Sequence, residues 1–217
     1  MPVWVKICGI TRMSDAEAAI VSGADAIGLN FAPQSARRLT VADARSIAEA
    51  CAGRVTRIGL FLDVPLTEVH ATLAEVPLDL VQFHGNESAE YCRAYSRAAR
   101  QPYIKAVPVR GPLDPSSLVA RFPDAWALLL DTWADGKTGG TGQVFDWTLW
   151  PKASDVRLIL AGGLTPDNVA GAVRRLQPWG VDVSGGVEGA TRGHKDPERI
   201  RQFITEVRSA GSERAGS

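Results

Sequence analysis

Short apolar runs alternate along the chain with longer stretches in which apolar residues recur at helical spacing. The runs are rich in Val, Ile and Leu, which is typical of parallel strands buried on both faces. The predicted strands cover residues 3–8, 26–31, 56–62, 78–83, 103–107, 127–131, 157–161 and 181–184. The predicted helices cover residues 14–22, 40–51, 65–75, 87–99, 116–121, 145–150, 165–176 and 196–208.

Helix start signals accompany several of these stretches. Ser14 followed by Glu17 has the spacing of a capping box, in which each side chain bonds the other residue's backbone N–H. Thr40 is a suitable N-cap for the second helix, and Pro65 suits the first turn of the third. The signals are weakest for the helices that follow the fifth and sixth strands.

Eight strand–helix repeats predict one α/β domain, a (β/α)₈ TIM barrel over residues 1–208. Residues 209–217 are small and polar, and predict a flexible C-terminal tail. An open doubly wound sheet is the alternative, but it usually has fewer strands and a glycine-rich turn after the first one. Here the glycines cluster after the sixth, seventh and eighth predicted strands.

Charge and cysteine usage narrow the class of protein. The chain has 24 Lys plus Arg and 24 Asp plus Glu, which gives no support for a nucleic-acid or membrane partner but allows a small anionic ligand. The odd number and wide spacing of Cys8, Cys51 and Cys92 argue against a disulfide framework and a zinc site. The sequence shows no signal peptide pattern and no apolar run of about 18 residues, so we expect a cytoplasmic protein. We also expect no bound metal.

Two reactive side chains end predicted strands, where the active sites of such barrels lie. Cys8 ends the first strand and Asp131 the sixth, so a thiol and a carboxyl group could act as base and acid across the barrel mouth. Lys6 lies two residues before Cys8 and shares its face. A small buried cysteine, and an aspartate that caps a helix or forms a structural ion pair, remain the alternatives.

A phosphate site is predicted from the glycines that follow the last two strands. Backbone N–H groups of such loops point at an anion, and this is the frequent phosphate location in the fold. Tight turns without a ligand are the alternative. The predicted phosphate-binding residues are Gly162, Gly163, Ser184, Gly185 and Gly186.

Other polar residues lie near the same end. His84 could donate a hydrogen bond to a ligand, and a guanidinium group from Arg37 or Arg38 would suit a carboxylate. Lys105, at the end of the fifth strand, could form a Schiff base with a carbonyl substrate, although an inward lysine is often paired with a carboxylate. Residues 133–143 predict a flexible loop over the site, either a lid that excludes water or a disordered surface loop.

Seven motifs resemble, in order and spacing, the signatures of phosphoribosylanthranilate isomerases. The resemblance extends from residue 4 to about residue 204. The motifs are KICGIT (6–11), VQFHG (81–85), LLD (129–131), GGTG (139–142), FDW (145–147), LAGGL (160–164) and GVDVS (180–184). Each motif is weak alone, but their shared order and spacing are specific.

The resemblance implies a (β/α)₈ barrel that performs an Amadori rearrangement of N-(5-phosphoribosyl)anthranilate to its 1-deoxyribulose isomer in tryptophan biosynthesis, without a metal or organic cofactor. It implies that Cys8 is the general base, that Asp131 is the general acid, and that Arg37 binds the anthranilate carboxylate. The other substrate contacts that we expect are His84, Gly140 and Asp182. A phosphorylated small molecule is the expected ligand, and other tryptophan-pathway enzymes are candidate partners.

The chain departs from the family pattern at two places. Gly185 stands where many members have a serine, which removes one hydroxyl donor and predicts somewhat weaker phosphate binding. The sequence Ser35-Ala36-Arg37-Arg38 replaces Ser-Pro-Arg and offers two arginines. Three alternatives remain: a related isomerase of histidine biosynthesis that uses two aspartates, an inactive barrel that binds a phosphate ligand, and a Schiff-base aldolase.

Overall fold

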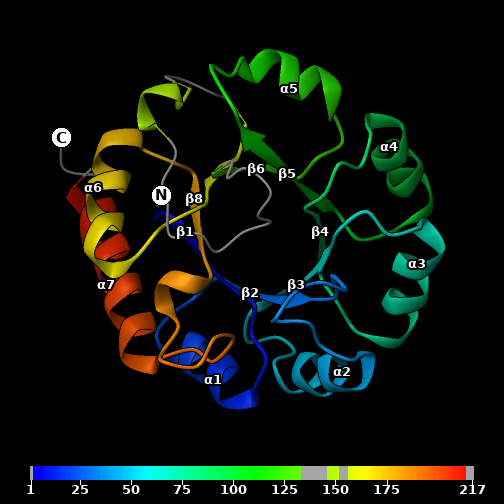
Figure 1. The fold of residues 1–217 in the computed structure, drawn as a ribbon, viewed down its shortest axis with the longest axis horizontal. Coiled ribbons are helices and arrows are strands. Elements are labelled where there is room, and N and C mark those ends of the chain that lie inside the picture. Colours follow the sequence, from blue (N-terminus) through cyan, green and yellow to red (C-terminus); the bar gives the residue numbers. More distant parts are fainter. Residues whose placement is uncertain (1, 133–145, 152–155, 214–217) are drawn as a thin grey trace.

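The computed structural model describes residues 2–132, 146–151 and 156–213, which form a closed barrel of eight parallel strands (Figure 1). The strands follow one another around the barrel in sequence order, and β1 pairs with β8 to close it. This confirms the predicted (β/α)₈ fold. The strands are β1 (Trp4–Cys8), β2 (Ala26–Asn30), β3 (Thr56–Phe61), β4 (Leu80–Phe83), β5 (Tyr103–Val109), β6 (Ala127–Thr132), β7 (Leu158–Leu160) and β8 (Gly180–Val183).

A ring of helices surrounds the strands (Figure 1). The α-helices of the described residues are α1 (Met13–Val21), α2 (Val41–Ala50), α3 (Leu66–Glu75), α4 (Ala89–Ala98), α5 (Pro115–Arg121), α6 (Pro166–Leu176) and α7 (Pro197–Glu213). Two short 3₁₀ helices, η1 (Trp147–Leu149) and η2 (Gly185–Val187), follow β6 and β8. Near residues 145–150, where the sequence predicts a helix, the described part of the chain therefore forms only the single turn η1.

The predicted helix starts were right at one place and wrong at another. Thr40 caps α2, because its side chain accepts a hydrogen bond at 3.1 Å from the backbone N–H three residues later. The capping box at Ser14 and Glu17 does not form. Helix α1 begins at Met13 with Arg12 at its N-cap, so both residues lie inside the helix, and Glu17 pairs instead with Arg54 at 2.6 Å.

The C-terminal helix extends beyond the predicted end of the barrel. Helix α7 continues to Glu213 rather than ending at residue 208, so this part of the predicted tail is helical. Ala210 and Gly211 are buried, and a Cβ added at Gly211 would lie 3.2 Å from Val3. Small residues thus let the last turn pack closely on the segment before β1, which is why a polar, small-residue composition does not produce a free end here.

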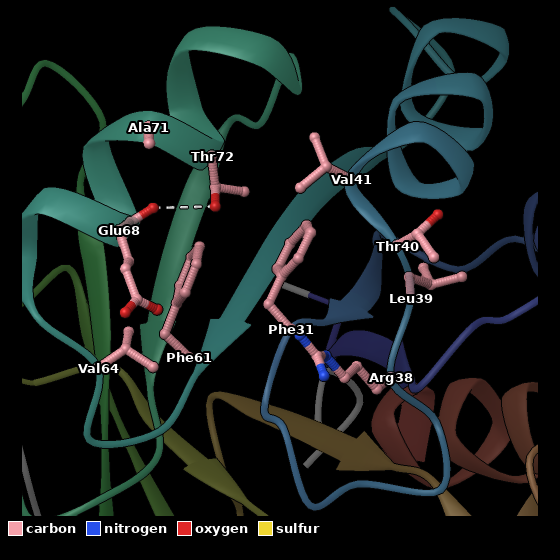
Figure 2. A pocket seen from close by; sticks show the side chains of 10 residues that line it. All are labelled: Phe31, Arg38, Leu39, Thr40, Val41, Phe61, Val64, Glu68, Ala71 and Thr72. Carbon is pink, nitrogen blue, oxygen red and sulfur yellow. Dashed lines mark hydrogen bonds between the residues drawn. The ribbon is translucent and has the colours of Figure 1, made fainter.

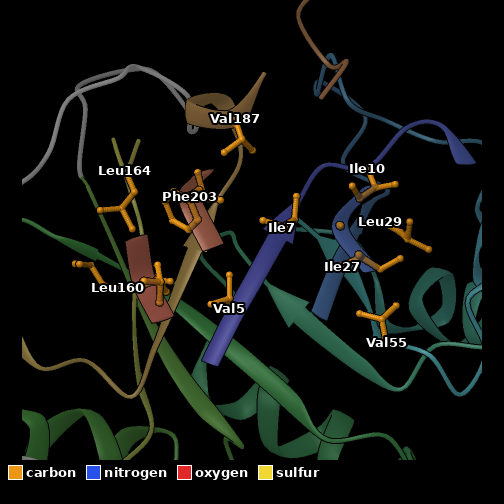
Figure 3. Close-up of a cluster of buried hydrophobic side chains, with 14 of the residues drawn as sticks. Val5, Ile7, Ile10, Ile27, Leu29, Val55, Leu160, Leu164, Val187 and Phe203 are labelled. Carbon is orange, nitrogen blue, oxygen red and sulfur yellow. The ribbon is translucent and has the colours of Figure 1, made fainter. Parts of the chain in front are cut away.

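Side chains alternate between two cores along each strand. Val5 and Ile7 of β1 belong to the apolar layer between barrel and helices, together with Phe203 of α7 (Figure 3). A second cluster contains Ala26, Ile58, Leu80, Ile104, Ala106, Ala127, Leu129, Ile159 and Ala161, and three tryptophans pack against it. Lys6 and Cys8 alternate with Val5 and Ile7, so they face the barrel interior.

Candidate active site

Lys6 and Asp182 form a buried ion pair inside the barrel. They are register partners on β1 and β8, and Lys6 Nζ lies 3.0 Å from Asp182 Oδ1, with side-chain exposures of 0% and 8%. Burial alone lowers the pKa of Lys6, but the neighbouring Asp182 carboxylate and Cys8 thiol reverse this and leave it raised. Asp182, predicted to bind substrate, thus holds a charged lysine beside Cys8.

Cys8 lies directly above this pair at the end of β1 and is almost fully buried. Gly28 is its register partner on β2, and a Cβ at Gly28 would lie 2.8 Å from the Cys8 sulfur and 3.1 Å from Lys6 Cε. Sequence reasoning missed Gly28, whose missing side chain makes the space for both groups. Burial raises the pKa of the Cys8 thiol, and the Lys6 ammonium opposes this only in part.

Asp131 on β6 is linked to β4 through a histidine. His84 Nε2 lies 3.1 Å from Asp131 Oδ2, and His84 Nδ1 lies 2.8 Å from Gln82 Nε2. The other carboxylate oxygen, Oδ1, accepts a hydrogen bond from the Thr132 backbone N–H at 2.8 Å. Asp131 is 18% exposed and His84 19% exposed, so both still reach the mouth of the barrel. His84, predicted to contact the ligand, thus contacts the predicted acid.

The two late glycine loops meet at the carboxyl ends of β7 and β8. Gly162 and Gly163 have φ angles of +86° and +63°, which favour glycine, and they lead directly into the N-terminus of α6. A Cβ at Gly186 would lie 1.8 Å from the Leu164 carbonyl oxygen, so this loop crosses the other one too closely for any side chain. The loops bring backbone N–H groups and a helix N-terminus to one place, as a phosphate site requires.

Ser184 and Gly185 occupy a more open part of the same region. Within the described part of the chain, the atom nearest to a Cβ at Gly185 would be Arg37 Nη2, at 3.5 Å. The Ser184 side chain faces the segment after β8, where Lys195 Nζ lies 3.4 Å from its hydroxyl oxygen. Position 185 therefore has room for the serine that many family members carry.

Arg37 extends from the loop after β2 to the segment after β8. Its guanidinium group donates two hydrogen bonds to Glu188, at 2.5 and 3.0 Å, and its side chain is 11% exposed. The Arg37 side chain passes close to Gly9, where a Cβ would lie 2.4 Å from Arg37 Cδ. The φ of Gly9, +72°, also favours glycine at this position. Glu188 holds the guanidinium plane in one orientation at the barrel mouth.

Lys195 completes this charged group. Its ammonium lies 3.1 Å from Glu188 Oε1 and 3.1 Å from the Ser184 carbonyl oxygen, and its side chain is fully buried. Burial lowers the pKa of Lys195, whereas burial of Glu188 is outweighed by Arg37 and Lys195, which hold its pKa at about 2. Two cations and one carboxylate leave one positive charge for an anionic ligand. Neither Glu188 nor Lys195 lies in a motif that marked it beforehand.

Arg38 lies outside this group. Its side chain lines a separate groove of about 570 Å³ between α2 and α3, beside Phe31 and Phe61 (Figure 2). The two rings are stacked with their centroids 5.1 Å apart, and Glu68 borders the same groove. Of the two candidate arginines, the one directed to the barrel mouth is Arg37.

Lys105 has a structural environment. Its ammonium bonds Glu87 Oε2 at 2.9 Å and the carbonyl oxygens of Phe83, Gly85 and Ala106, so it fastens the turn between β4 and α4. A lysine with four acceptors around it and only 4% exposure is poorly placed to attack a carbonyl group. This argues against the Schiff-base alternative.

Some predicted features lie outside the described residues, namely Gly140 and the loop at 133–143. Across residues 2–132, 146–151 and 156–213, no group of three or more His, Cys, Asp or Glu residues is arranged to hold a metal ion. Within that same part of the chain, no helix has both the length and the apolar character needed to cross a membrane.

Comparisons with known proteins identify the family of this chain. The family model described as N-(5'phosphoribosyl)anthranilate (PRA) isomerase matches residues 5–206. An N-(5'-phosphoribosyl)anthranilate isomerase of Pseudomonas fluorescens Pf-5 is 50% identical over 203 residues, 94% of each chain. One from Pseudomonas paraeruginosa PA7 is 49% identical over 213 residues, 98% of this chain and 99% of the relative.

Solved structures give the same result. Phosphoribosyl anthranilate isomerase from Thermotoga maritima is 38% identical with a TM-score of 0.85, covering 95% of this chain and 99% of its own. The enzyme from Thermus thermophilus is 38% identical with a TM-score of 0.84 and the same coverage. A third structure, in complex with reduced 1-(o-carboxyphenylamino)-1-deoxyribulose 5-phosphate, is 37% identical with a TM-score of 0.82, again over 95% and 99%. This chain belongs to the family of N-(5'-phosphoribosyl)anthranilate isomerases.

Proposed function

We propose that this chain converts N-(5'-phosphoribosyl)anthranilate to 1-(2-carboxyphenylamino)-1-deoxyribulose 5-phosphate, with Asp131 as general acid and Cys8 as general base. The observation that carries the proposal is the pair itself: a buried thiol beside a lysine at the end of β1, and a hydrogen-bonded carboxyl group at the end of β6. A relative whose structure holds a reduced form of the product supports the same substrate. The reaction belongs to tryptophan biosynthesis, and three free cysteines suit a reducing cytoplasm.

In the first step Asp131, protonated, gives its proton to the oxygen of the ribose ring. The bond between that oxygen and C1 breaks, and the lone pair of the anthranilate nitrogen forms a C=N bond to C1. The product of this step is an open-chain iminium ion, and Asp131 is left as a carboxylate. The Thr132 N–H group and the His84 ring nitrogen Nε2 then face the charge that has developed there.

In the second step Cys8, as thiolate, removes the proton from C2. The electron pair of that C–H bond forms the C1–C2 double bond, and the iminium nitrogen becomes neutral. The resulting enolamine takes a proton at C1 and loses the proton of its C2 hydroxyl group, which gives the ketone. The Lys6 ammonium stabilises the thiolate on which this step depends.

The two charged ends of the substrate would fix the reacting carbons between these groups. The phosphate would bind the loops after β7 and β8, through backbone N–H groups at Gly162, Gly163, Ser184 and Gly186. The carboxylate would bind Arg37, using guanidinium N–H groups that Glu188 leaves free. Anchors at both ends convert binding energy into orientation of C1 and C2.

Replacing Arg37 by alanine is expected to raise KM by about 10- to 100-fold, since hydrogen bonds to charged groups contribute about 1.5–3 kcal/mol. Arg38→Ala is the matched control, because Arg38 is exposed and lines the groove beside Phe31. Its KM should stay within about 2-fold of wild type, in the range of a surface substitution. Steady-state kinetics decide between them, and a large effect of Arg38→Ala alone would contradict the assignment.

Position 185 offers a gain-of-affinity test. Gly185→Ser adds a hydroxyl donor where the nearest described atom to a Cβ is Arg37 Nη2 at 3.5 Å. The value of KM is therefore expected to fall by about 3- to 10-fold, the contribution of one hydrogen bond. Gly186→Ser is the contrasting variant, because its Cβ would lie 1.8 Å from the Leu164 carbonyl oxygen. It should lower the melting temperature through a cost of about 1–3 kcal/mol. If both variants lowered the melting temperature equally, position 185 would not be the more open of the two.

The proposed function is tested by following anthranilate fluorescence as freshly prepared phosphoribosylanthranilate is consumed by the wild-type protein. The aminoaldose substrate of the related histidine-pathway isomerase is run in parallel. Turnover of the first substrate with little or none of the second supports the proposal. Turnover of the second substrate alone would show that the chain has the activity of the histidine-pathway isomerase. No turnover of either substrate would favour an inactive barrel that binds a phosphate ligand.

A further inference from the structure

A glutamine that the proposed reaction does not use lies behind His84. Gln82 lies in β4, and His84 directly follows the strand. Because the two residues are two positions apart, their side chains point to the same side of the sheet. Gln82 is fully buried, and its Nε2 lies 2.8 Å from His84 Nδ1. On the far side of the ring, His84 Nε2 lies 3.1 Å from Asp131 Oδ2. The three side chains therefore form one line that ends on the proposed acid.

The chemistry of the amide fixes the direction of these hydrogen bonds. An amide nitrogen only donates, so His84 Nδ1 must accept and carries no proton. The proton of the neutral ring is then on Nε2, which donates to Asp131.

The burial of Gln82 favours this orientation over the rotated one. Gln82 Oε1 is buried without a hydrogen-bond partner among residues 2–132, 146–151 and 156–213. Rotating the amide would put its two N–H donors at that same place and leave them unpaired. Buried unpaired N–H groups are rarer than under-satisfied carbonyl oxygens, so the rotated amide is the costlier arrangement.

We propose that Gln82 is a positioning residue that keeps His84 as a neutral Nε2–H donor to Asp131; this rests on the proposed function. A second proton on the ring would need Nδ1, which the Gln82 amide occupies. An imidazolium cation beside Asp131 would favour the carboxylate before the reaction begins and leave no acid. A neutral donor still stabilises the carboxylate as it forms, together with the Thr132 N–H group.

The backbone around His84 does not depend on Gln82. The His84 N–H donates to the Phe61 carbonyl oxygen at 2.9 Å, and the turn that follows is held by Glu87 and Lys105. Removing the amide should therefore change the state of the ring more than its place. Gln82→Met keeps the length of the side chain without the donor, and Gln82→Glu reverses the contact by offering an acceptor to Nδ1.

The experiment is ¹⁵N NMR of histidine-labelled protein, with His84 identified as the signal that His84→Asn removes. We expect Nε2–H in the wild type, and a proton on Nδ1 in Gln82→Glu. In both Gln82 variants kcat should fall by about 10- to 100-fold with KM within about 2-fold, part of the 10²–10⁴-fold that acid catalysis supplies. A wild-type ring protonated on Nδ1 would overturn the proposal, as would a folded Gln82→Met variant with unchanged kcat and ring signals.

The ring signals are read without substrate, so they separate this proposal from the proposed function. If the protein shows Nε2–H but has no turnover, the proposed reaction and the catalytic role of Gln82 are both refuted, whereas the direction of the hydrogen bond is supported. Active protein with the opposite ring state would refute the role of Gln82 and leave the reaction intact.

Discussion

Cys8→Ala is expected to lower kcat by about 10²–10⁴-fold, the usual contribution of a positioned general base. Alanine fills the site without a proton acceptor and leaves the Lys6–Asp182 ion pair in place, so KM should change little. Steady-state turnover of phosphoribosylanthranilate measures the effect. Cys51→Ala is the matched control, because Cys51 is also free and buried but lies at the end of α2.

The pH dependence gives the same prediction a second readout. Since burial raises the pKa of the Cys8 thiol, the free protein at neutral pH holds mostly thiol. The reactive thiolate fraction therefore grows as pH rises toward that pKa. In Asp131→Asn, where no carboxyl acid titrates, the residual kcat/KM should climb through the neutral and mildly alkaline range. A profile that is flat there, or a Cys8→Ala variant as active as Cys51→Ala, would remove Cys8 as the base.

Asp131→Asn is expected to lower kcat by a similar factor of about 10²–10⁴. Asparagine has the same shape, and its single amide oxygen can still accept from the Thr132 N–H group, so the fold and the substrate site should persist. What it lacks is the proton for the ring oxygen. The measurement is kcat with phosphoribosylanthranilate, beside a thermal melt that should stay close to wild type.

Asp114→Asn is the control for this substitution. Asp114 is an exposed N-cap of α5, and asparagine caps helices about as well. Its kcat should equal that of the wild type. If Asp131→Asn retained the activity of the control, ring opening would not depend on this carboxyl group, and the acid would have to be sought elsewhere.

The sequence was sufficient to predict the barrel because each strand is a short apolar run between helical patterns. It also predicted that Cys8 and Asp131 lie near the ends of β1 and β6, where the structure has them. Their catalytic roles stay a prediction. Helix ends were harder, since tertiary contacts decide them. Arg12 rather than Ser14 stands at the start of α1, and contact with Val3 extends α7.

The charged groups around Arg37 could not be predicted from spacing. Glu188 and Lys195 come from the segment after β8, and only the closure of the barrel brings them to the loop after β2. Gly28 was missed for a related reason, because its role is the space it leaves for Cys8 and Lys6 across the β1–β2 register. Such contacts depend on three-dimensional packing and leave no periodic signal in the sequence.

The catalytic roles of Cys8 and Asp131 are tested together by turnover of phosphoribosylanthranilate by wild type, Cys8→Ala, Asp131→Asn and the double variant, measured side by side. Because the acid and the base act on one reaction path, we expect an active wild type and two single variants whose kcat each falls by about 10²–10⁴-fold. The double variant should lose less than the product of the two factors. An active wild type with either single variant unimpaired would show that the substituted residue is not the acid or base of this reaction.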